Sequence, residues 1–250
     1  MFASLRKRVA YVTGGGSGIG AATSLMLASQ GVKVAVVDVK LEQAQAIAER
    51  ISSQGGEAIA IKADVSEPDE IQSSILETVE KYQRLDIAVN NAGIGGDQAE
   101  TSEIPVDSWR RVTSINLDGV FYCMKYEIPQ MLKNGGGSII NISSILGQVG
   151  FARASAYVAA KHGVVGLTQA AAIEYGPKKI RVNAVGPGFI RTPILSGLSD
   201  EMLNSVAQLH ALKRIGEPDE VAALITFLAS AESSFITGSY YPVDGGYLAS

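Results

Sequence analysis

Short apolar runs rich in valine and isoleucine alternate along the chain with stretches whose apolar residues recur at helical spacing. The runs lie at Val9–Thr13, Val32–Val37, Ala58–Ala63, Leu85–Val89, Ser138–Ile142 and Ile180–Ala184, with a shorter seventh expected near Ser239–Val243. Uninterrupted apolar runs are typical of strands buried on both faces, and their alternation with helices predicts successive βαβ units. We therefore expect an α/β fold, a doubly wound parallel sheet of about seven strands with helices on both faces.

The alternation is expected to form one domain over residues 1–250. Amphipathic helices are predicted between the strands, for example at Leu41–Ser53 and Pro68–Tyr82, and no linker or repeat of fixed period interrupts the pattern. The irregular stretch Gly186–Ser199 follows the sixth strand, at the end of the sheet where open α/β folds bind ligands. We predict that residues 186–208 form a mobile lid over a substrate.

Composition and charge narrow the classes of partner. The 250 residues carry a net charge of −4, which provides no basic field for a phosphate backbone, so nucleic acid is not expected as a partner. The single cysteine, Cys123, cannot form an internal disulfide, and its apolar neighbours predict a buried, inert thiol. No apolar run resembles a signal sequence or approaches the length of a membrane span, so a cytoplasmic protein without a membrane partner is expected.

The strand at Val9–Thr13 runs directly into the glycine-rich segment Gly14–Gly20, which opens a predicted helix over Ala21–Ser29. Such a turn lets main-chain N–H groups and the positive end of the helix approach a pyrophosphate, as in the Rossmann-type fold. A tight turn that binds no ligand would show the same glycines. The motif therefore needs support from elsewhere in the sequence.

That support comes from the second strand, which ends in Asp38, eighteen residues after Gly20. A carboxylate at this position can accept hydrogen bonds from the adenosine ribose hydroxyls and would repel the 2′-phosphate of NADP. NAD(H) is therefore the predicted cofactor. The open alternative is that Asp38 is only a solvated strand end, with Lys40 partly offsetting its charge.

Tyr157 and Lys161 are four residues apart in a strongly helical stretch, so their side chains are expected to project from one face. A lysine ammonium beside a tyrosine stabilises the phenolate and lowers the phenol pKa from about 10, which allows proton exchange with a carbonyl or alcohol oxygen. Spacing alone proves little, because Tyr175 and Lys179 share it across a helix-breaking Gly-Pro pair.

Further motifs surround the Tyr157–Lys161 pair. In chain order they read Thr13-Gly14-x-x-x-Gly18-x-Gly20, Asp64-Val65, Asn90-Asn91-Ala92-Gly93, Asn116, Ser144, Tyr157-x-x-x-Lys161 and Pro187-Gly188. Their order and spacing closely resemble those of the short-chain dehydrogenase/reductase family over nearly the whole chain. The resemblance implies an NAD(H)-dependent oxidoreductase that interconverts a secondary alcohol and a ketone, and a homotetrameric assembly.

The resemblance also implies a role for each matching residue. Tyr157 would act as general acid or base, Ser144 would hydrogen-bond the substrate oxygen, and Lys161 would hold the nicotinamide ribose. Asn116 would support a water through which Lys161 exchanges protons, and Ser143 is the neighbouring alternative to Ser144. The residues expected to contact the cofactor are Gly14, Ser17, Gly18, Ile19, Gly20, Asp38, Asp64, Val65, Asn91, Ala92, Gly93, Tyr157, Lys161, Pro187, Gly188, Ile190 and Thr192.

The substrate is expected to be a small apolar ketone or secondary alcohol, because the candidate lining of its pocket is mostly apolar. The candidates are Ile94, Ile145, Leu146, Gln148, Phe151, Phe189 and Leu195. No metal is expected in catalysis. His162 and His210 are not paired at ligand spacing and are interpreted as ordinary helix residues, and Asp244, which precedes two glycines, as a turn residue.

Two alternative functions stay open. The same family scaffold would also host a reductase of 3-oxoacyl thioesters that uses NADPH, although Asp38 argues against it. A non-catalytic dinucleotide-binding sensor would need none of the proton-transfer residues. For the implied homotetramer, Val221–Leu228 and Phe121–Met131 offer apolar faces, which simple coverage of the sheet explains equally well.

Overall fold

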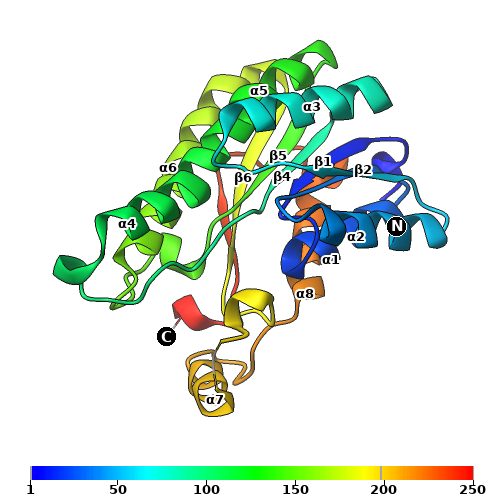
Figure 1. Cartoon of the computed structure of the whole chain (residues 1–250). Helices are drawn as coiled ribbons and strands as arrows, with labels where there is room; N and C mark the ends of the chain where they lie inside the picture. Colours follow the sequence, from blue (N-terminus) through cyan, green and yellow to red (C-terminus); the bar gives the residue numbers. More distant parts are fainter. Residues whose placement is uncertain (1, 198, 250) are drawn as a thin grey trace.

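One parallel sheet, in the order β3-β2-β1-β4-β5-β6-β7, runs through the computed structural model, which describes residues 2–197 and 199–249 (Figure 1). The strands are β1 (Val9–Thr13), β2 (Lys33–Asp38), β3 (Ala58–Lys62), β4 (Ile87–Asn90), β5 (Gly137–Ile142), β6 (Ile180–Pro187) and β7 (Tyr240–Val243). The predicted doubly wound fold is thereby confirmed. The strand order reverses between β1 and β4, so the carboxyl ends of these strands flank the crevice where such sheets bind ligands.

The bounds of β1 are those predicted, and the bounds of the other strands differ from the predicted ones by one to three residues. The largest difference is at β6, which continues past Ala184 to Pro187. The cause is its pairing with β7, which matches Ala184 with Tyr240 and Pro187 with Val243. This extension carries the chain to the mouth of the crevice before it leaves the sheet.

Helices cover both faces of the sheet (Figure 1). The α-helices of the described residues are α1 (Gly18–Ser29), α2 (Leu41–Ser53), α3 (Pro68–Tyr82), α4 (Val106–Thr113), α5 (Gly119–Lys133), α6 (Ser155–Tyr175), α7 (Asp200–Gln208) and α8 (Pro218–Ala229), of which α7 does not lie on the sheet. Alternate residues of β1 point to opposite sides: Tyr11 packs in a cluster with residues of α3, α5 and α6, and Val12 in one with residues of α1, α2 and α8. β1 therefore contributes to two cores, which explains its unbroken apolar run.

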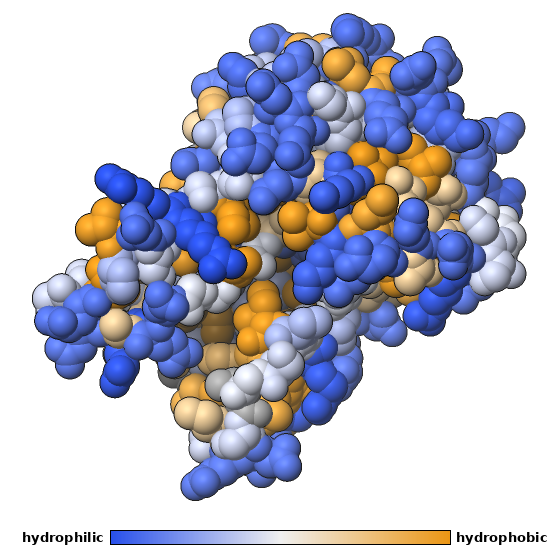
Figure 2. Space-filling model, in the orientation of Figure 1, coloured by the Kyte–Doolittle hydropathy of each residue, from blue (hydrophilic) through white to orange (hydrophobic). Residues whose placement is uncertain are grey.

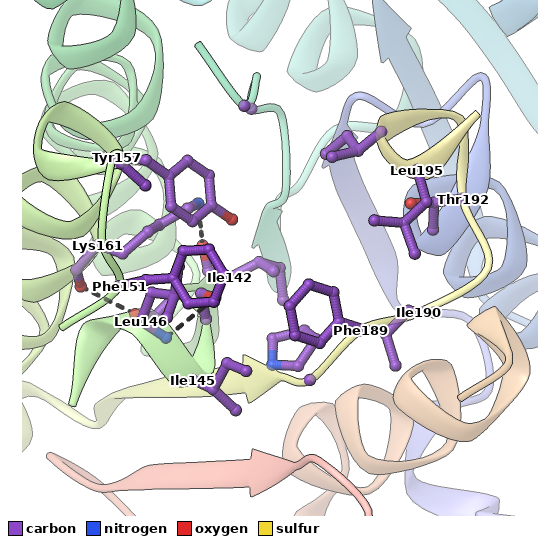
Figure 3. Close-up of a pocket in the computed structure, with 18 of the residues that line it drawn as sticks. Ile142, Ile145, Leu146, Phe151, Tyr157, Lys161, Phe189, Ile190, Thr192 and Leu195 are labelled. Atoms are coloured by element: carbon purple, nitrogen blue, oxygen red, sulfur yellow. Dashed lines mark hydrogen bonds between the residues drawn. The ribbon is translucent and has the colours of Figure 1, made fainter. Parts of the chain in front are cut away.

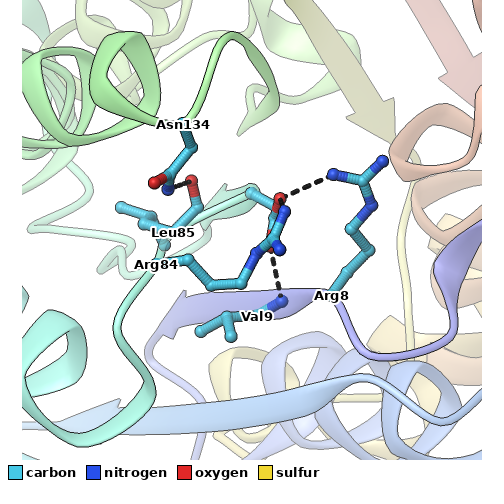
Figure 4. A network of polar contacts seen from close by, with 6 residues as sticks. Arg8, Val9, Arg84, Leu85 and Asn134 are labelled. Atoms are coloured by element: carbon cyan, nitrogen blue, oxygen red, sulfur yellow. Dashed lines mark hydrogen bonds and ion pairs between the residues drawn. The ribbon is translucent and has the colours of Figure 1, made fainter.

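A buried carboxylate ties the amino ends of the strands together, on the side of the sheet away from the crevice. Asp86 accepts hydrogen bonds from the Val9 N–H (3.0 Å) and from the guanidinium groups of Arg8 (2.7 Å) and Arg84 (2.6 and 2.7 Å) (Figure 4). Burial raises the pKa of Asp86, but these hydrogen bonds outweigh burial and leave the pKa below its ordinary value. The network fixes β1 beside β4 and has no part in the crevice.

The stretch expected to be a lid begins where the sheet ends. Residues 186–208 comprise the last two residues of β6, a 3-10 turn at Pro193–Leu195, and α7, which lies apart from the layers of the fold (Figure 1). Leu198, inside this stretch, lies outside the described residues. The mobility of the lid stays a prediction.

Candidate active site

The glycine turn after β1 is shaped by close main-chain contacts. Gly14 and Gly18 have positive φ values of 58° and 50°. A Cβ on Gly20 would overlap the carbonyl oxygen of Gly14, so only glycine lets α1 pack this close to the turn. The first N–H groups of α1 are not capped by the side chain of Ser17. They remain free to face an anion such as a pyrophosphate.

Asp38 is not a solvated strand end, since only 7% of it is exposed. Its carboxylate accepts the Gly16 N–H and the Lys40 N–H, each at 3.0 Å. The two hydrogen bonds anchor a negative charge directly beside the glycine turn. A carboxylate next to a main-chain anion site is the arrangement that a dinucleotide requires, so the residues present fit such a cofactor.

Asn91 and Val65 make structural contacts at this end of the crevice. The side chain of Asn91 donates to the carbonyl oxygens of Thr13 (2.9 Å) and Gly14 (3.1 Å), which ties the end of β4 to the glycine turn. Val65 is buried and packs against Gly119 at the start of α5. Both were expected to contact the cofactor, and both also hold together the main chain around it.

The proposed catalytic residues converge at the carboxyl end of β5 (Figure 3). Lys161, on α6, donates from Nζ to the carbonyl oxygen of Ile142 (2.8 Å), and its Nζ lies 5.6 Å from the ring centre of Tyr157. Ser144 lies within hydrogen-bonding reach of Tyr157. The hydroxyl of Ser143 instead donates to the main-chain carbonyl of Lys161 (2.9 Å), so it is engaged away from the phenol.

The ionisation of this pair differs from the prediction. Burial raises the pKa of Tyr157, and the hydrogen bond with Ser144 offsets only part of that rise; burial also lowers the pKa of Lys161 to about 8. The expected lowering of the phenol pKa by the lysine was therefore wrong for this structure. The reason is that desolvation disfavours both charges, while the ammonium is directed to the Ile142 carbonyl. Tyr157 is held as a neutral phenol, which is a proton donor.

Asn116 reaches the site from a distorted helical segment. A π-helical turn at Ser114–Asp118 joins α4 to α5, and the fully buried Asn116 side chain bonds both the N–H (2.9 Å) and the C=O (2.8 Å) of Ile94. A Cβ on Gly93 would lie 3.2 Å from Oδ1 of Asn116 and 3.6 Å from Nζ of Lys161, so both groups approach Gly93 closely. Single π turns inside helices are frequent at functional sites.

A pocket of about 300 Å³ opens in front of Tyr157. Figure 2 shows apolar surface gathered around the hollow at the centre of this face. The predicted cofactor and catalytic residues that line the pocket are Ile19, Asn91, Gly93, Ser144, Tyr157, Lys161, Pro187, Gly188, Ile190 and Thr192. The others form the glycine turn and its surroundings (Gly14, Ser17, Gly18, Gly20, Asp38), the segments after β3 and β4 (Asp64, Val65, Ala92), and the π turn (Asn116).

The predicted substrate residues are only partly together. Ile145, Leu146, Phe151, Phe189 and Leu195 line the pocket. Ile94 and Gln148 do not: the main chain of Ile94 is bound by Asn116, and Gln148 is exposed after the turn Ile145–Gly147. Sequence reasoning missed Gly95, Gly96, Asp97, Gln98, Ala154 and Ile194, which also line it. The loop after β4 carries no periodic pattern that would have revealed its four residues.

The predictions for the two histidines had different outcomes. His162 lies on α6, exposed, as predicted. His210 was wrongly predicted as a helix residue, because α7 ends at Gln208 and His210 occupies the bend that follows.

Asp244 is confirmed as a turn residue that accepts the N–H groups of Gly246 and Leu248. Within residues 2–197 and 199–249, no cluster of three or more His, Cys, Asp or Glu side chains could hold a metal ion.

Comparison with known proteins decides the family. The family model described as enoyl-(acyl carrier protein) reductase matches residues 14–248. The chain belongs to the short-chain dehydrogenase/reductase family. It is therefore an oxidoreductase, and dehydrogenases of this family use a nicotinamide dinucleotide.

Individual relatives match over almost their full length. The chain is 48% identical to a cyclohexanol dehydrogenase of Acinetobacter sp. (strain SE19), covering 96% of this chain and 94% of the relative. It is 43% identical to a cis-4-hydroxycyclohexanecarboxylate dehydrogenase of Sinomonas cyclohexanicum, covering 97% of each. The crystal structure of a levodione reductase superposes with a TM-score of 0.95 at 37% identity, covering 98% of this chain and 99% of that one.

Other comparisons and observations bear on the earlier expectations. Proteins named 3-oxoacyl-[acyl-carrier-protein] reductase also match, at 38% and 42% identity. Cys123 is buried, as predicted. Among the helices of the described residues, none combines the length and apolar character needed to span a membrane.

Proposed function

We propose that this enzyme interconverts a cyclic secondary alcohol and its ketone with NAD(H). The observation that carries the proposal is the meeting of Ser144, Tyr157 and Lys161 at one wall of an apolar pocket beside the glycine turn. The cyclic substrate is supported by the names of two relatives, a cyclohexanol dehydrogenase and a cis-4-hydroxycyclohexanecarboxylate dehydrogenase.

The chain's own residues would handle the proton. When bound, the nicotinamide supplies or accepts the hydride. Tyr157 donates its phenolic proton to the ketone oxygen, and Ser144 donates a hydrogen bond to the same oxygen, stabilising the charge that develops there. Lys161, with its pKa lowered to about 8, is poised to return a proton toward Tyr157. Asn116 holds the Ile94 main chain next to Gly93, which Lys161 also approaches.

The preference for NAD over NADP rests on Asp38. Its carboxylate is buried and fixed by two main-chain N–H groups, so it cannot swing away from a 2′-phosphate. A fixed negative charge beside the adenosine ribose would accept hydrogen bonds from its hydroxyls and repel a phosphate there. The glycine turn, with the uncapped start of α1, would hold the pyrophosphate.

The second candidate is a reductase of 3-oxoacyl thioesters that uses NADPH. It is favoured by the relatives of that name, which are less similar than the cyclohexanol dehydrogenase. The position of Asp38 argues against it. A non-catalytic dinucleotide sensor is disfavoured because it would have no use for a buried Lys161 and a neutral phenol facing a pocket.

We also propose a homotetramer in the cytoplasm. The first interface segment expected from the sequence, Val221–Leu228, turns its apolar residues Val221, Ile225 and Leu228 into the core under the sheet. The second leaves Phe121 exposed on α5, and Ile173 on the neighbouring α6 is 79% exposed. The α5 and α6 face is therefore the better candidate for contact between subunits.

The direct test is Tyr157→Phe. The variant should lose turnover of cyclic ketones by about 1,000-fold while NADH affinity stays unchanged, because the substitution removes the proton and little else. Turnover would be followed by absorbance of the reduced cofactor and affinity by fluorescence titration. Tyr175→Phe, on the same helix, is the matched control and should be fully active. Substantial activity in Tyr157→Phe would refute the assignment.

A further inference from the structure

His210 is buried against the back of the active-site wall. It lies in the bend after α7, with 2% of its surface exposed, and does not line the catalytic pocket. Its Nε2 accepts the main-chain N–H of Phe189 at 3.2 Å, and its ring meets the Phe189 ring edge-on, with centres 5.7 Å apart and planes at 87°. A Cβ on Gly188 would lie 2.9 Å from Nε2, so glycine at this position permits the approach.

Phe189 is part of the pocket wall opposite Phe151. The two rings meet edge-on at 6.4 Å, and both line the pocket in front of Tyr157. Phe189 stands directly after Pro187-Gly188, on the segment that continues to Ile190 and Thr192. Its position therefore sets the width of the pocket at the substrate.

The wall is backed in part by ring packing, since the rings of His210 and Tyr247 lie 5.7 and 6.2 Å from that of Phe189, centre to centre. Gly188, Phe189 and Ile190 also line a second pocket of about 290 Å³ behind them, which His210 shares. Because open space lies on both sides of the segment, hydrogen bonds must supplement this packing to hold it in place. The Phe189 carbonyl accepts the Gly216 N–H at 2.9 Å, and the Phe189 N–H has His210 as its acceptor.

The hydrogen-bonding role of the ring is defined by its chemistry. To accept at Nε2, a neutral imidazole carries its proton on Nδ1, and Nδ1 of His210 is buried with no partner among the described residues. The N–H of Phe189 would be left without an acceptor if the ring nitrogen were removed, and buried main-chain donors are strongly disfavoured without one. Of the two ring nitrogens of His210, Nε2 is therefore the one that makes a hydrogen bond, and its partner is the Phe189 N–H.

We propose that His210 is a positioning residue, which fixes Phe189 as the wall of the substrate pocket through this hydrogen bond. The consequence for catalysis rests on the proposed ketone reductase function. Loss of the acceptor should loosen the wall and weaken ketone binding, while the proton-transfer residues stay in place.

Two substitutions separate the hydrogen bond from the ring packing. His210→Phe keeps an aromatic ring and removes the acceptor, and His210→Gln keeps an acceptor oxygen near the place of Nε2 and removes the ring. We expect His210→Phe to raise KM for a cyclic ketone about tenfold with kcat within about twofold, and His210→Gln to restore KM to within about threefold. Leu209→Ala, exposed beside His210 in the same bend and in the lining of neither pocket, is the control for a general disturbance and should behave as wild type.

A second readout does not depend on turnover. Hydrogen exchange of the Phe189 amide should accelerate at least about tenfold in His210→Phe and recover in His210→Gln. If the wild type reduces no cyclic ketone, the proposed function fails, but the exchange result still tests the role of His210. An unchanged KM and unchanged exchange in His210→Phe, or equal losses in both variants, would overturn the proposal.

Discussion

At the nucleotide end of the crevice the functional groups are main-chain atoms and polar side chains bonded to them, whereas at the substrate end they are side chains on open loops. Asp38 is bonded to Gly16, and Asn91 to Thr13 and Gly14. By contrast, Phe151 and Ile194 in the substrate pocket are 39% and 58% exposed. The nucleotide end would bind the same cofactor whatever the substrate, so its groups can be held rigidly. The loops at the substrate end are free to vary. Substitutions should therefore act on all substrates alike at one end and selectively at the other.

Among the changes that distinguish the two ends of the crevice, the largest effect is expected for Gly20→Ala. The added Cβ overlaps the Gly14 carbonyl, so α1 or the turn must shift, and NADH affinity should fall about 100-fold by fluorescence titration. Gly176→Ala, at the position just past α6 and with nothing near its Cβ, is the matched control and should keep full affinity. A folded Gly20→Ala protein that binds NADH normally would show that the turn is not the cofactor cradle.

Asp38→Ala should change the choice of cofactor. Removing the fixed carboxylate is expected to lower the ratio of kcat/KM for NAD to that for NADP by about 30-fold, for every substrate tested. Asp69→Ala removes the same charge from an exposed position on α3 and should leave the ratio unchanged. A ratio that stays constant in Asp38→Ala would place cofactor specificity elsewhere.

The pH dependence should follow Lys161. Its pKa is lowered from 10.5 to about 8, so the ammonium is present below pH 8 and is lost as the pH rises through that value. If Lys161 returns a proton to Tyr157 as proposed, kcat/KM for ketone reduction should fall about tenfold per pH unit above 8, whereas alcohol oxidation should not fall. Rate profiles in both directions would check this. A reduction profile that is flat through pH 8 would exclude Lys161 from the proton path.

The smallest effect is expected at Asp97, whose carboxylate is part of the lining of the pocket. Asp97→Asn should improve kcat/KM for 4-oxocyclohexanecarboxylate relative to cyclohexanone about fivefold, since a screened like-charge repulsion is removed. Glu100→Gln, exposed nearby but outside the pocket, is the control. Equal ratios in wild type and Asp97→Asn would mean that the carboxylate does not face the substrate.

The parts of the fold that repeat a simple pattern could be predicted from the sequence. Buried strands such as β1 and β2 are recognisable in the sequence as apolar runs. The spacing of Tyr157 and Lys161 places both residues on one helix face. The glycine turn can be recognised in the sequence because its geometry permits only glycine at position 20. These features are local, so a window of sequence contains their cause.

Features that depend on tertiary contacts could not be predicted. The pKa of Tyr157 follows from burial that the spacing does not reveal. His210 sits among helix-forming residues, and its contact with Phe189, twenty-one positions away, leaves no trace in the local sequence. Asp97 and Gln98 enter the pocket from a loop without periodicity. In each case the cause lies in a segment that is distant along the chain.

The most direct test of the central claim is the initial rate of cyclohexanol oxidation with NAD and with NADP, measured beside the reduction of a 3-oxoacyl thioester with NADPH. The account predicts turnover of cyclohexanol with NAD, with a preference over NADP of at least about tenfold. Turnover confined to NADPH and the thioester would contradict it.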